Sequence, residues 1–472
     1  MKWKAHGSEC TLNFEGEIFE TEDQRNWTDA SYKTYCTPQS MPCPAIVRKG
    51  EKISQRIEFK LDRGDVAEIA DSKAVQITIN PLGLSARPLI GVGRSTRPMP
   101  LTDEEIGILR NISFDHYRVD LYLFRTDWRE EADRAAKEAA GLNYSLELAL
   151  FFDEHASRQL DDFIKWVTDL KLEISVITIF HRTVAATTGL LLDTIAPTLK
   201  RILPSVRIGC GTNANYAQLD RNATESENAD YLCYSVHPQE HASDNTTLVE
   251  NIQGQAYTVE SALQFANGKG IWVSPVNLQR RFNANIENYE TPPSHTIIPA
   301  QVDSRIMSLF GACWTAISIK YIGEAGAKGI TYYETAGERG IMQGDYDSRW
   351  PEEFKTAKGM LFPVYHLFKY LLKDKSFGLI QCSSSRPLDA DCLALSDGQR
   401  IKLVFVNFTS AGQRILSSGL SGKIKVKMLN AATFSDAAID PDWIEKSWES
   451  KVWEPGELIL DPYSLTFIEG FL

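Results

Sequence analysis

The sequence predicts an α/β protein: a (β/α)8 TIM barrel with a short β segment before it and an antiparallel β-sandwich after it. In the middle of the chain, eight short apolar runs alternate with helical patterns. A barrel of this kind closes with eight parallel strands that are joined by helical crossovers. At both ends of the chain, apolar and polar residues alternate with period 2, as in β-strands, and helical periodicity is absent. We therefore expect three domains, at residues 1–86, 87–375 and 376–472.

The N-terminal β segment is expected from the runs TLNFEGEIFE, YKTYCTP, EKISQRIEFKL and AVQITI, which follow period 2. A polar stretch within it, residues 20–35, gathers charges, amides and aromatic rings. Its Trp27, Tyr32 and Tyr35 need apolar cover while its charges need partners, so we expect it to reach the barrel mouth. A solvated surface loop is the alternative.

The barrel strands are expected at residues 88–93, 117–124, 146–152, 174–180, 206–212, 230–236, 271–278 and 330–335. The crossovers between them carry helix signals, such as the capping box from Thr102 to Glu105 and the helical spacing of residues 157–170. The fifth crossover, YAQLDRNATESENA, is short and polar. A doubly wound open sheet is the alternative, but no GxGxxG loop opens any of its helices.

After Asp374 the helical patterns stop and period-2 runs such as RIKLVFVNFT and KIKVKML return, which favours a small antiparallel sandwich. Composition limits the function classes. The formal net charge is −12, and Lys and Arg do not cluster, which argues against nucleic acid and anionic membranes as partners. The eight cysteines lack CxxC or zinc-ligand spacing, and the N-terminus has no apolar signal region, so we expect reduced thiols and a cytoplasmic protein.

The active site of a barrel lies at the carboxyl ends of its strands. Glu334 ends the eighth strand, and a lone carboxylate there costs free energy to bury unless it is used or paired. The other polar residues at strand ends are Arg118, Asp120, Asp153, Glu154, His181, Arg182, Asn213, Asn215, His237, Gln239, His241, Asp244, Asn277, Arg280 and Arg281.

Several of these residues have a structural alternative. Arg118 and Asp120 share a strand face, so they could form an ion pair inside the barrel. His181 could be a hydrogen-bonded histidine at a strand end. His237 and His241 with Asp244 suggest a metal site, but Pro238 makes this segment a loop, so helical zinc-ligand geometry is excluded and no metal is expected.

Seven motifs together resemble the D-apionate lactonase family: EDQRNWTDASYKTY, RVDL, GTNANYAQLDR, PQEHASD, SPVNLQRRFN, QVDSRIMSLFGACWT and TYYETAGERGIM. They run from about residue 17 to residue 345. The resemblance implies a glycosidase-like barrel between β domains and the hydrolysis of D-apionolactone to D-apionate. Fewer residues precede the first motif than in the family, so we expect either a relative with a shortened N-terminal β domain or a chain whose start has been cut.

Hydrolysis of a lactone needs a base for water, donors for the oxyanion and an acid for the departing oxygen. We expect Glu334 to be the base, His241 or His181 the acid, and Arg118 with Asn213 the donors. The remaining substrate-binding candidates are Asp120, Asn215, His237, Gln239, Asn277 and Arg281. No cofactor is expected, and the expected partner is a small sugar lactone.

Two other functions stay open. A glycoside hydrolase would need a second carboxylate about 5 Å or about 6.5–9.5 Å from the first. At the end of the fifth strand, where such an acid is expected, the chain reads Thr-Asn-Ala-Asn from Thr212. A non-catalytic carbohydrate-binding barrel would have no acid that faces the pocket. No G-x-S-x-G motif supports a serine-esterase route.

Overall fold

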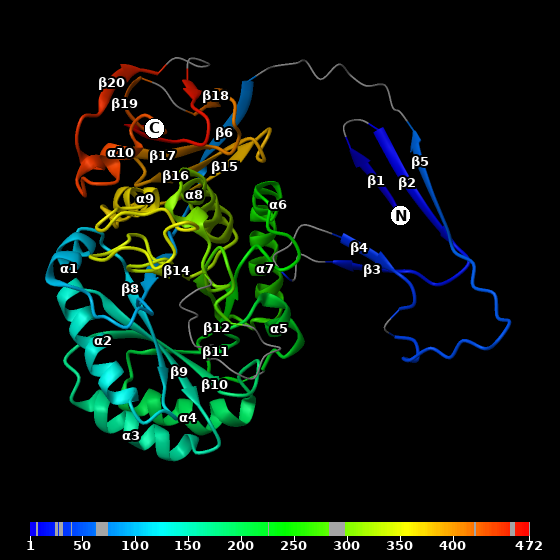
Figure 1. The fold of residues 1–472 in the computed structure, drawn as a ribbon, viewed down its shortest axis with the longest axis horizontal. Helices are drawn as coiled ribbons and strands as arrows, with labels where there is room; N and C mark the ends of the chain where they lie inside the picture. The colour runs from blue at the N-terminus through cyan, green and yellow to red at the C-terminus, as the bar shows by residue number, and fades with distance from the viewer. Residues whose placement is uncertain are drawn as a thin grey trace.

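The computed structural model describes residues 1–5, 8–23, 27, 32–38, 40–62, 74–224, 226–282, 298–419, 422–453 and 458–471. The chain forms a closed barrel, at the lower left of Figure 1, and a nine-stranded sheet packs against it, above the barrel in that view. The N-terminal strands form two small sheets beside the barrel. The predicted fold class is confirmed, with one change to the C-terminal sheet that is described below.

The barrel closes with all neighbouring strands parallel, in the order of the sequence. Its strands are β7 (Leu89–Gly93), β8 (His116–Tyr122), β9 (Ser145–Phe152), β10 (Ile174–His181), β11 (Arg207–Gly211), β12 (Tyr231–Val236), β13 (Gly270–Val276) and β14 (Gly329–Glu334). Each matches one predicted strand to within about two residues. The match is close because these strands are buried on both faces and read as continuous apolar runs.

Helices surround the barrel (Figure 1). They are α1 (Asp103–Arg110), α2 (Trp128–Leu142), α3 (Ala156–Thr168), α4 (Gly189–Ile202), α5 (Tyr216–Arg221), α6 (Asn245–Glu250), α7 (Ile252–Phe265), α8 (Leu309–Glu324) and α9 (Pro363–Leu372). The predicted capping box is present, because Thr102 and Glu105 bond each other's backbone N–H. The fifth crossover holds only the six-residue α5. Over the described parts of the chain, no helix is long and apolar enough to cross a membrane.

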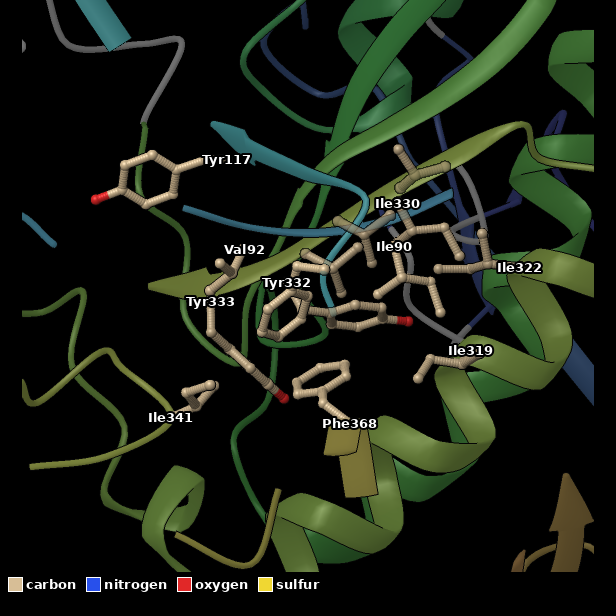
Figure 2. Packing of buried hydrophobic residues seen from close by; sticks show 14 of the residues in the cluster. Ile90, Val92, Tyr117, Ile319, Ile322, Ile330, Tyr332, Tyr333, Ile341 and Phe368 are labelled. Atoms are coloured by element: carbon tan, nitrogen blue, oxygen red, sulfur yellow. The ribbon is translucent and has the colours of Figure 1, made fainter. Parts of the chain in front are cut away.

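Two apolar layers hold the barrel together. Large side chains, among them Phe151, Tyr231 and Trp272, fill its interior. The outer layer joins strands to helices, and Figure 2 shows β14 packed against α8 and α9 through Tyr332, Ile319 and Phe368. The hydroxyls of Tyr332 and Tyr333 also lie 2.9 and 2.7 Å from those of Ser318 and Thr315 on α8. β14 is thus fixed to the helix behind it.

The nine-stranded sheet is mixed, not purely antiparallel as predicted. Its strands, in spatial order, are β20 (Glu449–Val452), β19 (Lys423–Leu429), β22 (Leu465–Phe471), β17 (Arg400–Asn407), β16 (Ala390–Ser396), β15 (Gly378–Ser384), β6 (Ala74–Ser85), β18 (Gln413–Ser418) and β21 (Leu458–Leu460). β6 runs parallel to β18 and antiparallel to β15. It lies within the segment 1–86 that we assigned to the N-terminal domain, yet it pairs with C-terminal strands.

The location of β6 has a physical reason. Val75, Ile77 and Ile79 alternate on one face of the strand and are buried in the core of the nine-stranded sheet. A buried ion pair ties the same sheet to the barrel: Nζ of Lys320 on α8 lies 2.6 Å from Oδ1 of Asp391 on β16. The sheet is therefore joined to the barrel by strand β6 as well as by packing.

The N-terminal strands are β1 (Lys2–Ala5), β2 (Ser8–Glu15) and β5 (Arg56–Asp62), which form a three-stranded sheet, and β3 (Glu20–Asp23) with β4 (Tyr32–Tyr35). In Figure 1 the three-stranded sheet stands to the side of the barrel, with β3 and β4 between the two. The paired strands β3 and β4 are therefore the part of the N-terminal region that lies nearer the barrel.

Candidate active site

An irregularity in β14 sets the direction of the Glu334 side chain. In a regular strand Tyr332 and Glu334 would face the same side. Tyr333, however, has a φ of 50°, and the pairing of β14 with β7 shifts register between Tyr332 and Glu334. Both tyrosines consequently pack on the helix side (Figure 2), whereas Glu334 lines a cavity. A positive φ at a bulky residue costs on the order of 1 kcal/mol or more, and here it aims a carboxylate.

The two carboxylate oxygens of Glu334 have different surroundings. The backbone N and Oγ1 of Thr96, on the loop after β7, donate to Oε2 at 2.8 and 2.9 Å. Oε1 lies 3.3 Å from Nε of Arg339 and 3.7 Å from Nε of Arg281. This buried oxygen makes no hydrogen bond with any residue that the structure describes. One oxygen therefore fixes the group, and the other faces two guanidinium groups at the cavity.

The cavity in front of Glu334 has a volume of about 290 Å³. Four predicted site residues line it: Asp120, Asn213, Arg281 and Glu334. The rest of the lining is Ser95, Thr96, Arg97, Pro98, Met99, Tyr122, Phe282, Pro299, Gln301, Val302, Ala336, Gly337, Glu338, Arg339, Tyr346, Arg349 and Trp350. The side chains of the lining are mostly charged or polar.

Arg118 lies beneath this cavity and holds two of its lining residues. Its Nε donates to Oδ1 of Asp120 at 2.9 Å, its Nη2 to Oδ1 of Asn213 at 2.6 Å and its Nη1 to Ser274 at 2.8 Å. Burial would raise the pKa of Asp120, but the charges of Arg118 and Arg281 outweigh it and lower that pKa. The ion pair weighed as the structural alternative for Arg118 and Asp120 is therefore present, and it also faces the site.

A buried acid on β9, Glu147, was not among the predicted residues. Its oxygens lie 2.9 Å from Nε2 of His116 and accept hydrogen bonds of 2.6 Å from Ser274 and Thr331. Burial would raise the pKa of Glu147, but the facing charges of His116 and Arg118 bring it down to about 2. Glu147 interrupts the apolar run LELALFF, a signal that the search for residues at strand ends passed over.

The loop after β14 supplies residues that the sequence analysis also missed. This loop folds back on the strand, because the backbone N of Glu334 donates to the carbonyl of Arg339 at 2.9 Å. That contact places the Arg339 side chain over the carboxylate. Glu338 lines the same cavity and accepts hydrogen bonds from Tyr346 and Ser348, both at 3.3 Å. Glu338 is therefore a third carboxylate in the cavity, after Glu334 and Asp120, and it comes from a loop.

Comparison with known proteins bears on this site. A sequence model of the D-apionate lactonase TIM-barrel domain matches residues 90–376, more than half of the chain, and one of the N-terminal domain matches residues 1–64. The chain belongs to the D-apionate lactonase family. A D-apionate lactonase from Brucella anthropi is 24% identical over 414 residues, which cover 80% of this chain and 63% of that protein.

Solved structures show the same fold as this member of the D-apionate lactonase family. An α-L-arabinofuranosidase from Thermotoga maritima superposes with a TM-score of 0.57 at 10% identity, over 84% of this chain and 100% of that one. A GH30 endoxylanase from Clostridium papyrosolvens gives a TM-score of 0.53 at 10% identity, with the same coverage. At such identities the likeness concerns the fold alone.

Besides Arg118, four predicted substrate-binding residues lie outside the described lining of the lactonase-family cavity: Asn215, His237, Gln239 and Asn277. His237 is buried, and burial, helped by the charge of Arg280, lowers its pKa to about 3, so it stays neutral at ordinary pH. Gln239 donates to Asp303 at 2.6 Å and accepts from Arg305 at 2.8 Å, which ties the loop after β12 to the start of α8. Their role in substrate binding stays a prediction.

The two histidines expected to be the acid are also absent from the described lining of the cavity. His181 accepts a hydrogen bond of 3.2 Å from the backbone N of Thr183. His241 is exposed, because the loop that starts at Pro238 carries it outward, and its ring meets Trp27 edge to face at 6.3 Å. The described residues contain no group of three or more potential metal ligands. The role of His181 or His241 as the acid stays a prediction.

Trp27 joins the N-terminal region to the barrel. Besides His241, its ring lies 5.0 Å from the guanidinium of Arg221 at the end of α5. The expected contact of residues 20–35 with the barrel is thus present at Trp27, whereas residues 24–26 and 28–31 of this stretch lie outside the described residues.

Trp27→Ala should loosen β3 and β4, because a cation–π and an aromatic contact, each worth about 0.7 kcal/mol, are lost. We expect amides of β3 and β4 to exchange hydrogen roughly tenfold faster, as about 1.4 kcal/mol implies. Trp3→Ala is the matched control, because Trp3 contacts Phe59 within the three-stranded sheet. Equal exchange rates in the two variants would show that Trp27 does not anchor the segment.

Proposed function

We propose that this chain hydrolyses a sugar lactone, an aldonolactone similar to D-apionolactone, to the aldonate by attack of water on the acyl carbon. Membership of the D-apionate lactonase family supports a hydrolase that acts on a small sugar derivative. The observation that carries the mechanism is the unequal pair of oxygens on Glu334. A carboxylate that is fixed through one oxygen, and whose other oxygen makes no hydrogen bond with a described residue, is suited to general-base catalysis.

In the proposed reaction, Oε1 of Glu334 accepts a proton from water as its oxygen attacks the lactone carbonyl. The guanidinium groups of Arg339 and Arg281, which flank this oxygen, stabilise the oxyanion of the tetrahedral intermediate. When the bond from carbon to the ring oxygen breaks, the protonated Glu334 returns its proton to that oxygen. One carboxyl group thus serves as base and then as acid, and no histidine is required.

Recognition of the sugar falls to the other lining residues. Asp120 and Asn213 are both held by Arg118, so their orientation towards a substrate hydroxyl is fixed before binding. Arg349 lines the cavity without an ion pair to any described residue, and its guanidinium can bind the carboxylate of the product. The substrate is therefore a small polyol lactone.

Glycoside hydrolysis is the second candidate, and one observation favours it. Three carboxylates, Asp120, Glu334 and Glu338, line the same cavity, and Glu338 adds to the two that were expected there. A pair of carboxylates is what glycosidases use. Asp120, however, is already engaged by Arg118 and Arg281, so Glu338 would have to be the partner of Glu334.

The two candidates are separated by assaying the same protein with a panel of aldonolactones and a panel of aryl glycosides. Acid release from lactones is followed with a pH indicator, and the rate without protein gives the spontaneous opening. We expect lactones to be opened and aryl glycosides to be left intact. Cleavage of glycosides with no lactone hydrolysis would establish the second candidate. Turnover of neither panel would overturn both and favour a binding role.

A further inference from the structure

The nine-stranded sheet has a hollow of its own, far along the chain from Glu334. Its volume is about 570 Å³, larger than the cavity at the barrel mouth. Strands β17, β22, β19 and β20 form it side by side. Their pairing registers place two rows of side chains on one face: Lys402, Glu469, Lys425 and Ser450, then Arg400, Phe471, Lys423 and Val452. All eight residues line the hollow.

Apolar groups form part of this surface. Further along the same face, Val404 and Phe467 are buried against the barrel helices. The next residues on that face extend past this contact, which leaves Phe471 and Val452 65% and 58% exposed. Phe377, which follows α9, adds a buried ring to the lining. An exposed aromatic and aliphatic pair inside a hollow favours an apolar ligand.

Positive charge surrounds the apolar part. Of the four cations in the two rows, Arg400 is paired with Asp374 and Asp397 at 2.9 and 2.6 Å. Lys423 and Lys425 have no ion pair with any residue of the described chain, although the protein as a whole carries a net charge of −12. Among the described residues of the lining, Glu469 is the single acid.

Burial disfavours the charged form of Lys402 in this hollow. Its ammonium lies 4.9 Å from the ring of Phe377, and its side chain is buried, so burial lowers its pKa even though Glu469 acts in the opposite direction. An anion placed near this group would stabilise its charged form. The hollow is therefore complementary to a ligand that combines an apolar body with negative charge.

We propose that this hollow binds small amphipathic anions, with the apolar body on Phe471 and Val452 and a carboxylate or sulfonate head between Lys423 and Lys425. The site is separate from the barrel chemistry. It would take a carboxylate with an aromatic or alkyl body in preference to a neutral sugar, because the lining offers ammonium groups and apolar rings.

The test uses 8-anilinonaphthalene-1-sulfonate as the probe, followed by its fluorescence on the folded full chain, beside the uncharged N-phenyl-1-naphthylamine. We expect saturable binding of the sulfonate to one site, weakened at least tenfold in Lys423→Glu/Lys425→Glu and in Phe471→Ala. We also expect it to be displaced by dodecanoate but not by dodecanol. Lys137→Glu, a charge reversal at an exposed lysine of α2, is the matched control and should bind as the wild type does.

Thermal melting of each variant shows that the sheet stays folded, and lactone turnover should be the same in all of them, because the substitutions lie outside the barrel. If the double variant melts early, Lys423→Gln and Phe471→Ala carry the test alone. The proposal is overturned if the wild type does not bind the sulfonate. It is equally overturned if Lys137→Glu loses as much affinity as the double variant, or if the uncharged compound binds as tightly.

Discussion

Glu334→Gln should reduce lactone turnover by about 10²-fold or more, the usual contribution of a general base. The amide keeps the size of the carboxylate and can still accept the two bonds from Thr96, so the loop and the barrel should remain in place. It cannot take a proton from water. The expected signature is therefore a fall in kcat with little change in KM, measured by acid release from the preferred lactone at saturating concentration.

Glu338→Gln is the matched control, because Glu338 lines the same cavity on the neighbouring loop. We expect it to retain most of the turnover if Glu334 serves as both base and acid. A comparable loss in both variants would assign the acid to Glu338. Near-full activity of Glu334→Gln would show that the base is elsewhere, with Asp120 the next candidate.

Glu147→Gln should lower the free energy of unfolding by about 3–5 kcal/mol at neutral pH, the range for breaking a buried charge pair. The amide takes away the anion that faces His116 and Arg118 in the centre of the barrel, where Arg118 keeps only its pair with Asp120. Arg118 in turn orients Asp120 and Asn213 at the cavity, so a smaller loss of kcat should accompany the loss of stability. Urea unfolding measures the first effect.

The difference in free energy of unfolding between the wild type and Glu147→Gln should depend on pH, and the direction follows from the pKa of Glu147. The pKa of Glu147 falls from an ordinary 4.5 to about 2 on folding, so the unfolded chain takes up the proton first as the pH drops. The stability that Glu147 contributes is complete above pH 4.5 and is lost towards pH 2. The gap between wild type and Glu147→Gln should narrow in that window. Glu130→Gln, on an exposed position of α2, should show no comparable gap.

The barrel could be predicted from the sequence because its strands are buried on both faces, and the signal of each lies within the strand itself. The place where the N-terminal segment ends could not be predicted from the sequence. The run AVQITI reads as a strand, but its apolar face fits the core of the C-terminal sheet, and its neighbours β15 and β18 lie beyond the whole barrel. Pairing between segments so distant leaves no local trace in the chain.

The site was predicted in part for a similar reason. Glu334 ends an apolar strand, and a carboxylate at that position can be recognised in the sequence as a candidate site residue. Nothing in the sequence shows that the loop after β14 folds back and brings Glu338 and Arg339 into the same cavity. The histidines were chosen by residue type, and the loop after Pro238 places His241 outside the described lining of the cavity. Residue type indicates which side chains could belong to a site, whereas the conformation of the loops determines which of them line the same cavity.

Strand β6 also has a consequence for how the protein can be made and cut. During synthesis it leaves the ribosome before the barrel, and both of its neighbours arrive only after the barrel is complete. Until then its edges are unpaired, and Val75, Ile77 and Ile79 have no core to enter, a state that favours association with other nascent chains. A fragment that ends with the barrel would keep this exposed strand. Any exchange of the barrel between family members therefore has to leave residues 74–85 with the C-terminal sheet they complete.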